Sequence, residues 1–209
     1  KVIELPLHEE LGWQWDIDEL RSRISKKTKM IAVCHPNNPT GSIVSTDNMR
    51  SIIDIASEND CWILSDEVYR GAELNGIESP SFYGSYEKTI VNAGLSKAYR
   101  LPGLRLGWTV GPRDYIEKAW AFHDYTSISI AFHSDWVASK ILKKERRKEI
   151  LDGTKKHLNE NLNTLREWVG SLDGKLSMNL PQAGAIAFVR IHMNESSEKL
   201  TYHIRDNFS

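Results

Sequence analysis

The sequence is poor in the features that mark secreted, membrane-spanning or nucleic-acid-binding proteins. It holds 2 cysteines in 209 residues, too few for a disulfide framework in a chain of this length. No apolar run approaches the roughly 20 residues that a membrane span requires. Lysine and arginine number 27 against 28 aspartates and glutamates, a net charge of −1, so no positive excess favours nucleic acid or anionic membranes. These absences favour a cytoplasmic, reduced protein.

The beginning of the chain carries neither a signal peptide nor an initiator methionine, since it opens with Lys1. We therefore expect residue 1 not to be the natural start. Cys34 and Cys61 fall in segments that are expected to form interior strands, so we interpret both as buried free thiols.

Short β-rich runs alternate with amphipathic helical patterns, and this alternation is typical of an α/β fold. The runs expected to form strands are Met30–Cys34, Cys61–Leu64, Thr89–Asn92 and Leu104–Val110. A helix is expected to follow a cap at Ser45 or Thr46, because apolar residues recur there at helical spacing. Prolines and a glycine exclude regular structure from Asn37–Gly41, which lies between the first strand and this helix.

The later part of the chain is expected to be mainly helical and then to change character. One helix is predicted from Arg113 to about His123, and another from about Ser134 to Val169, with Asp152 and Gly153 as a possible break. After Gly170 we expect a hairpin and a final helix, in the segments Lys175–Met178, Ala185–Ile191 and Ser197–Asn207. This change predicts two domains, 1–140 and 141–209.

Polar residues gather where the predicted strands end. Asn38 follows the first strand, Asp66 and Tyr69 the second, and Lys97 the third, while Arg105 lies at the start of the fourth. Ligands of open α/β sheets bind beyond the carboxyl ends of the strands, so these groups are expected to converge. Together they offer a carboxylate for a ring nitrogen, donors for a phenolate, an amine for an aldehyde and a cation for a phosphate. Those are the functional groups of pyridoxal phosphate (PLP).

Three motifs resemble those of the class I/II aminotransferases, the fold-type I PLP enzymes. They are Asn37–Gly41 (NNPTG), Asp66–Tyr69 (DEVY) and Ser96–Trp108 (SKAYRLPGLRLGW), in the family's order and at its spacing. Pro181–Gly184, followed by Phe188, is similar to the hairpin that opens the family's small domain. The resemblance implies a three-layer sandwich around a mostly parallel sheet, a partial PLP-binding large domain, and the start of a smaller α+β domain.

The resemblance also implies roles for individual residues. Lys97 would be the Schiff-base lysine and proton shuttle, Asp66 would hold the pyridine nitrogen protonated, and Tyr69 and Asn38 would bind the ring oxygen. Arg105 and Ser96 would bind the phosphate. The cofactor-binding residues implied are therefore Asn38, Asp66, Tyr69, Ser96, Lys97 and Arg105. Of these, Lys97, Asp66 and Tyr69 would be catalytic.

The substrates implied are an α-amino acid and a 2-oxo acid, and the expected assembly is a homodimer. No metal site, nucleic-acid partner or membrane partner is expected. In isolation, Asp66 is equally typical of a helix cap, Asn38 of a turn, Tyr69 of a half-buried aromatic and Arg105 of an ion pair. Only their combination favours the cofactor site.

The chain departs from the family pattern in ways that leave alternatives open. Gly94 stands where a phosphate-binding serine is common. The family's phosphate loop lies upstream of residue 1 and its carboxylate-binding arginine beyond Ser209, so the chain resembles the middle of an aminotransferase of about twice its length. Because the motifs bind cofactor without choosing the reaction, a PLP-dependent carbon–sulfur lyase or another fold-type I enzyme remains an alternative. An inactive fragment is a further one.

Overall fold

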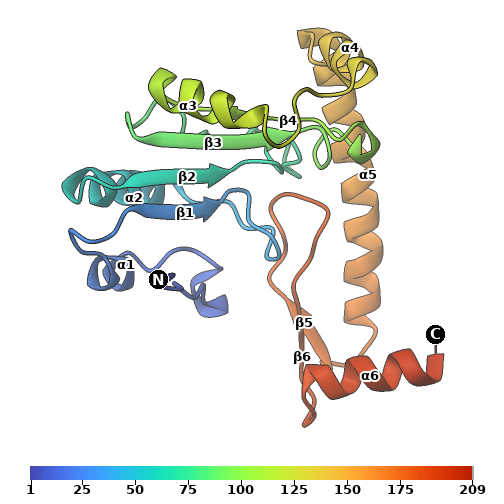
Figure 1. Ribbon diagram of the computed structural model, residues 1–209. Helices are drawn as coiled ribbons and strands as arrows, with labels where there is room; N and C mark the ends of the chain where they lie inside the picture. Colours follow the sequence, from blue (N-terminus) through green and yellow to red (C-terminus); the bar gives the residue numbers. More distant parts are fainter. Residues whose placement is uncertain (209) are drawn as a thin grey trace.

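The computed structural model describes residues 1–208 and is built around a four-stranded sheet in the order β1-β2-β3-β4 (Figure 1). Strands β1 (Met30–Cys34), β2 (Trp62–Asp66) and β3 (Thr89–Gly94) are parallel, and β4 (Gly107–Val110) is antiparallel to β3. The α/β class and the mostly parallel sheet predicted from the sequence are confirmed. The carboxyl ends of β1 to β3 share one edge of this sheet.

The fourth strand begins later than the predicted Leu104–Val110. Pro102–Leu104 instead form a 3₁₀ helix, η2, which ends at Arg105 in the left-handed backbone region with φ 49°. A residue in the left-handed region cannot continue an extended strand, and the β3–β4 ladder begins only at Gly107. The apolar pattern alone did not reveal this interruption.

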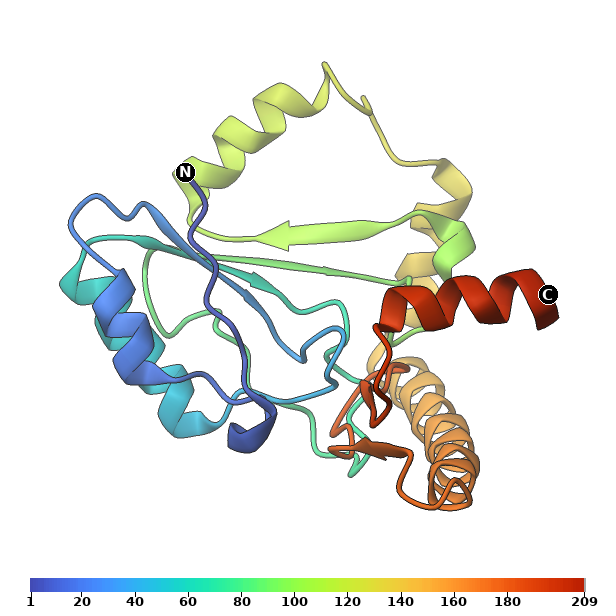
Figure 2. The ribbon, with the colours of Figure 1, turned by 90° about the horizontal axis from the view of Figure 1, so that it is seen from below.

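Helices cover both sides of the sheet, as Figure 2 shows. Helices α1 (Ile17–Arg23) and α2 (Thr46–Glu58) lie on one side, and α3 (Arg113–His123) lies on the other. The α2 helix begins after Ser45, whose side chain accepts a hydrogen bond from the backbone N–H of Asn48. The predicted cap is therefore confirmed at Ser45.

The two faces of the sheet differ in burial, because successive side chains of a strand point to opposite sides. We call the side under α2 the closed face; its residues Ile31, Val33, Ile63 and Ser65 are at most 5% exposed. Met49, Ile52, Ile55 and Ala56 of α2 complete that core. We call the other side the open face; it presents Ala32, Cys34, Asp66, Asn92 and Thr109, which are half-buried or exposed.

Two helices replace the single one predicted from Ser134 to Val169. They are α4 (Phe132–Ile141) and the 27-residue α5 (Lys144–Gly170). The chain turns at Lys143, which has an extended backbone, whereas Gly153 lies inside α5 without breaking it. A single glycine destabilises a helix by only about 1 kcal/mol relative to alanine, so the helical turns on both sides of Gly153 can keep α5 continuous.

After α5, β5 (Leu176–Met178) and β6 (Val189–Ile191) form a separate antiparallel pair, followed by α6 (Ser197–Phe208). Both strands are shorter than predicted. β5 begins one residue late, at Leu176, and β6 begins at Val189 because residues 185–188 form no ladder. A short 3₁₀ helix, η1 (Glu9–Leu11), lies near the amino end. Neither it nor α1 was predicted from the sequence.

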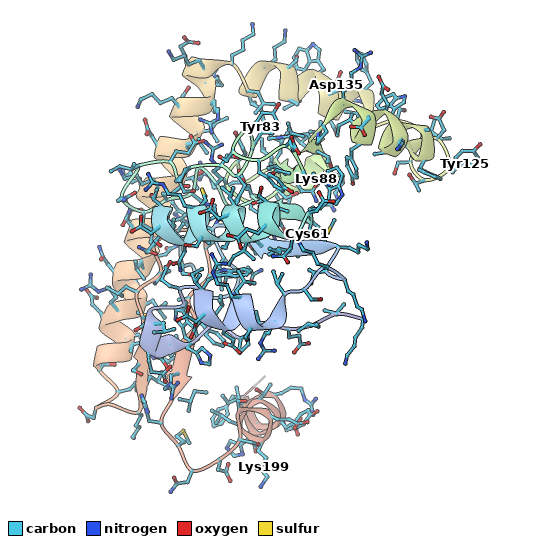
Figure 3. The ribbon with its side chains drawn as sticks, turned by 90° about the vertical axis from the view of Figure 1, so that its left-hand side faces the viewer. Cys61, Tyr83, Lys88, Tyr125, Asp135 and Lys199 are labelled. Atoms are coloured by element: carbon cyan, nitrogen blue, oxygen red, sulfur yellow. The ribbon has the colours of Figure 1, made fainter. Side chains whose placement is uncertain are left out.

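A run of exposed aromatic side chains extends from α3 to α4. Trp120, Phe122, Tyr125, Phe132 and Trp136 are between 56% and 87% exposed. Tyr125 stands at the outer tip of this region, away from the sheet (Figure 3). No helix within residues 1–208 is both long and apolar enough to cross a membrane.

Candidate active site

Three loops carry the predicted site residues to one edge of the sheet. Asn37–Gly41 follows β1, Asp66 ends β2, and Lys97 lies three residues after the end of β3 at Gly94. The strand ends point toward α5 and the β5–β6 segment (Figure 1). The strand order therefore brings the loops after β1, β2 and β3 to one edge of the sheet, as expected.

Asn38, Tyr69 and Lys97 are brought together by three different loops. The Asn38 amide Nδ2 donates to the Tyr69 hydroxyl at 3.2 Å, and Lys97 Nζ lies 5.8 Å from the centre of the Tyr69 ring. Since the Tyr69 oxygen accepts from Asn38, its own O–H proton remains free for another acceptor. Tyr69 is 6% exposed, whereas the Lys97 side chain is open to solvent.

Asp66 lies on the open face, in register with Cys34 of β1 and Asn92 of β3. Its Oδ1 accepts a hydrogen bond from the backbone N–H of Val68 at 3.2 Å, which leaves the other carboxylate oxygen without a partner within residues 1–208. Burial raises the pKa of the Cys34 thiol; a backbone hydrogen bond from Asn38 opposes this increase, and the nearby Asp66 carboxylate adds a smaller one. Cys34 is half-buried rather than fully buried, and both cysteines are free.

The predicted phosphate ligands are less engaged than the other site residues. Arg105 is exposed, and its Nη1 donates to the carbonyl oxygen of Pro102 at 2.9 Å rather than to a carboxylate. Ser96 is half-buried, and its side chain forms no hydrogen bond within residues 1–208. A Cβ added at Gly94 would lie 3.1 Å from the Leu106 carbonyl oxygen, so the close approach of β4 favours glycine over serine there.

The Pro181–Gly184 segment packs between the first two loops. Gln182 and Ala183 both donate their backbone N–H to the carbonyl oxygen of Gly41, at 2.8 and 3.0 Å. Gly41 has φ 68°, and a Cβ there would lie 2.4 Å from Pro181 Cβ, so only glycine fits this contact. Gly184 has φ 82°, and a Cβ there would lie 3.3 Å from Tyr69 Cδ1 at the edge of the ring.

Glu67 is a buried carboxylate whose importance sequence reasoning missed. It is 3% exposed, and its Oε1 accepts from Ser65 Oγ, Ser81 Oγ and the Phe82 N–H at 2.9 to 3.1 Å. Burial raises the pKa of Glu67, and these hydrogen bonds counteract part of that increase. Its place inside the DEVY motif, between two site residues, was the only available signal.

His35 is a second buried titratable group beside the first loop. It is fully buried; Nδ1 accepts from the Val44 N–H at 3.1 Å, and Nε2 lies 3.0 Å from the Pro80 carbonyl oxygen as its donor. Burial lowers the pKa of His35. This arrangement fixes one neutral tautomer and makes His35 a structural residue.

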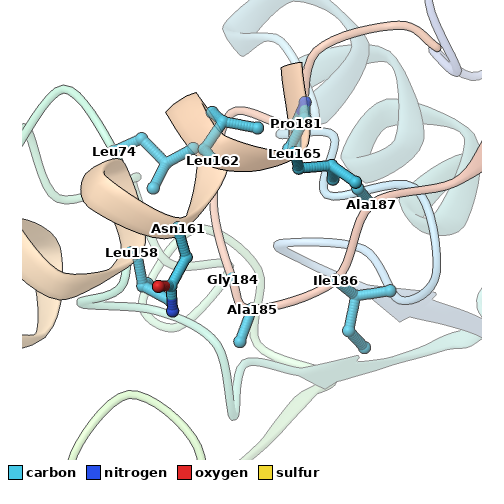
Figure 4. A pocket seen from close by; sticks show the side chains of 10 residues that line it. All are labelled: Leu74, Leu158, Asn161, Leu162, Leu165, Pro181, Gly184, Ala185, Ile186 and Ala187. Carbon is cyan, nitrogen blue, oxygen red and sulfur yellow. The ribbon is translucent and has the colours of Figure 1, made fainter. Parts of the chain in front are cut away.

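A cavity of about 120 Å³ lies between α5 and residues 181–187 (Figure 4). Its walls are mainly apolar and come from Leu74, Leu158, Asn161, Leu162, Leu165, Pro181, Gly184, Ala185, Ile186 and Ala187. The cavity does not include Lys97 or Asp66. Within residues 1–208, no group of three or more histidines, cysteines or acidic residues could hold a metal ion.

The protein has an α/β fold, and loops at the carboxyl edge of its sheet carry a lysine, a carboxylate and a Tyr–Asn pair. These residues are Lys97, Asp66, Tyr69 and Asn38. The family described as aminotransferase class I and II matches residues 1–208. The chain belongs to that family, as its motifs predicted.

The relatives agree with this assignment. The aromatic-amino-acid aminotransferase 2 of Thermococcus litoralis is 34% identical over 70% of this chain and 38% of its own length. The capreomycidine synthase of Streptomyces vinaceus is 27% identical over 88% of this chain and 47% of its own. A crystal structure of a PLP-dependent aminotransferase from Streptococcus suis superimposes with a TM-score of 0.90 and 33% identity, over 99% of this chain and 54% of that one. The chain thus spans about half the length of these relatives or less.

Proposed function

We propose that the protein is a PLP-dependent aminotransferase that moves an amino group between an α-amino acid and a 2-oxo acid. The observation that carries this proposal is the meeting of Asn38, Tyr69 and Lys97 at the sheet edge where Asp66 ends β2. These side chains come from three separate loops, so their proximity is a property of the fold.

The donor set fits PLP in its chemistry. The free Tyr69 proton and the second Asn38 N–H are two donors suited to one phenolate oxygen. Asp66 retains a carboxylate oxygen for a protonated ring nitrogen, and Lys97 offers an accessible amine for an aldehyde. Arg105 and Ser96 are our candidates for the phosphate, with Gly94 unable to supply a hydroxyl there.

Each residue would have a distinct task in the reaction. Bound PLP supplies an electron-withdrawing ring that stabilises negative charge at the substrate Cα. Asp66 holds a proton at the ring nitrogen, while Tyr69 and Asn38 stabilise the ring oxygen in its anionic form. The Lys97 amine would hold the cofactor at its aldehyde group and would move a proton at the substrate Cα.

A second reaction class deserves a direct test, because one relative is named a synthase rather than an aminotransferase. The same cofactor residues serve elimination as well as amino transfer, so a carbon–sulfur lyase is the alternative. The non-catalytic alternative is that the chain acts as an inactive fragment.

The primary experiment is absorption spectroscopy of the purified protein mixed with PLP. We expect a band near about 420 nm, as a lysine Schiff base of the cofactor gives. Borohydride reduction followed by peptide mass spectrometry should then place the cofactor on Lys97. Lys97→Ala should lose both signals, whereas Lys118→Ala, at an exposed lysine of α3, should keep them. A wild-type protein that gives no band would favour the inactive fragment.

Reaction class is decided by offering amino acids with a 2-oxo acid acceptor and measuring the products. An aminotransferase yields a new oxo acid and a new amino acid in equal amounts, without free ammonia. Release of ammonia together with pyruvate would contradict the aminotransferase and favour the lyase.

We further propose that the protein is a homodimer located in the cytoplasm. The exposed aromatic run from Trp120 to Trp136 supports a protein interface, because monomers rarely expose such continuous apolar surface. The two free thiols support a reducing compartment. Light scattering of the purified protein tests the dimer, and fractionation of cells tests the location.

A further inference from the structure

Helix α5 contacts both loops that carry the proposed catalytic residues. In Figure 1, α5 lies beyond the carboxyl ends of the parallel strands and runs across their direction. Arg147, Leu151 and Thr154 are spaced four and three residues apart, so they share one face of this helix. None of the three residues belongs to the motifs Asn37–Gly41, Asp66–Tyr69 or Ser96–Trp108.

Arg147 links the two loops through its guanidinium group. Nη2 donates to both carboxylate oxygens of Glu78 at 2.9 Å, and Nε donates to the Tyr99 hydroxyl at 2.9 Å. Glu78 also pairs with Arg70 Nη2 at 3.0 Å. Tyr99 lies two residues after Lys97, and Arg70 directly follows Tyr69. Arg147 therefore connects Tyr99, close to Lys97, with Glu78, which in turn pairs with the residue after Tyr69.

Thr154 gives the Lys97 loop an independent attachment to the same helix. It is 2% exposed, and its Oγ1 lies 2.9 Å from the carbonyl oxygen of Ala98 and 3.0 Å from that of Ile150. Leu151, one turn earlier, packs so closely on Gly71 that a Cβ there would lie 3.1 Å from both leucine methyls. The helix thus holds residues 71 and 98 by packing and hydrogen bonding.

We propose that Arg147 and Thr154 are positioning residues that hold Lys97 and Tyr69 at the separation the reaction requires. This inference rests on the proposed function, since it concerns the same two side chains. Arginine is needed at 147 because a planar fork reaches Glu78 and Tyr99 together, whereas a lysine ammonium on a single stem would serve one of them. Neither residue would contact substrate or cofactor.

The first arm of the test is hydrogen exchange of the cofactor-free protein, with Arg147→Lys, Tyr99→Phe and their combination. Each single variant should speed amide exchange in residues 94–101 about ten-fold, because an attachment of that loop is lost. The double variant should be no faster than either single one, since both remove the same hydrogen bond. Arg146→Lys is the matched control, because within residues 1–208 Arg146 pairs only with Glu149, on the exposed side of α5.

The second arm uses the loaded protein and a pair of variants at Thr154. Thr154→Val keeps the shape and loses the hydroxyl, whereas Thr154→Ser keeps the hydroxyl. We expect Thr154→Val and Arg147→Lys to weaken PLP binding about ten-fold, as is typical of residues that orient ligands. They should also shift the pH midpoint of the bound cofactor's absorbance by about 0.5 pH unit. Thr154→Ser should match the wild type in both measurements.

The inference is overturned if Arg147→Lys and Thr154→Val show the same amide hydrogen exchange and the same PLP affinity as the Arg146→Lys control. It is also overturned if Thr154→Ser behaves like Thr154→Val, because the hydroxyl would then be irrelevant. A wild-type protein that binds no PLP refutes the proposed function alone, since the hydrogen-exchange arm still reports whether α5 restrains the two loops.

Discussion

The two faces of the sheet are made by the same strands and yet have opposite properties. On the closed face Ile63 and Ser65 are completely buried under α2. On the open face, Asp66 and its register partners Cys34 and Asn92 remain partly accessible at the carboxyl edge. Because neighbours in a strand point to opposite sides, one residue can stabilise the fold while the next is free for chemistry.

The comparison predicts that substitutions on the two faces of one strand, β2, will separate stability from activity. Ile63→Ala on the closed face should cost about 2–5 kcal/mol of unfolding free energy, because it leaves a cavity in a fully buried core. Chemical denaturation measures this loss. PLP binding by the folded fraction should be unchanged, and a loss of binding without destabilisation would break the comparison.

Asp66→Asn on the open face should have the reverse effect. The amide oxygen can still accept from the Val68 N–H, so unfolding free energy should change by less than about 0.5 kcal/mol. Turnover should fall at least about 100-fold, because a neutral amide no longer holds a proton on the ring nitrogen. Steady-state kinetics with PLP in excess measures this, and an active variant would contradict the role of Asp66.

Gly41→Ala sharpens the comparison at the loop that follows β1, between the sheet and the Pro181–Gly184 segment. The new Cβ must displace Pro181 and adopt a left-handed backbone, so we expect a loss of about 2 kcal/mol in unfolding free energy. Thermal denaturation is the measurement. Gly12→Ala provides the control, since Gly12 has similar φ, 61°, but open space around it. Equal losses in both variants would show that the Pro181 contact is unimportant.

His35 gives the smallest expected effect, which depends on pH. Its folded-state pKa is lowered by burial, so the unfolded chain binds more protons below about pH 6.5, and stability falls as pH decreases through that range. The slope cannot exceed about 1.4 kcal/mol per pH unit for one proton. The charges of Glu73 and Arg70 also act on His35: the Glu73 carboxylate raises its pKa and the Arg70 guanidinium lowers it, both by less than burial does. Denaturation of wild type and His35→Gln at several pH values measures the difference, and identical slopes would refute it.

Much of the fold follows from local patterns. The first strand, Met30–Cys34, and helix Arg113–His123 have the bounds that periodicity predicted, and Ser45 caps α2 as expected. These elements are bounded by prolines, glycines and capping residues, whose effects are local. The break at Lys143 and the late start of β4 were missed, because neither the extended backbone of Lys143 nor the left-handed backbone of Arg105 changes the apolar pattern. The domain boundary at 140/141 stays a prediction.

The candidate site was predictable in composition and less so in its contacts. Three motifs indicated Asn38, Tyr69 and Lys97, and the structure brings these three together. The roles of all six residues, Asn38, Asp66, Tyr69, Ser96, Lys97 and Arg105, stay predictions. Nothing in the sequence pairs Arg147 with Glu78, 69 residues away, because a long-range ion pair leaves no local periodicity.

The unbroken length of α5 has a mechanical consequence. A helix of 27 residues extends about 40 Å, so α5 reaches from the neighbours of Lys97 to the β5–β6 pair as one stiff rod. A slight tilt pivoting at Arg147 becomes a displacement of several ångströms at the far end. A displacement at the hairpin would therefore reach Arg147 as a slight tilt of α5, beside the loop that carries Lys97.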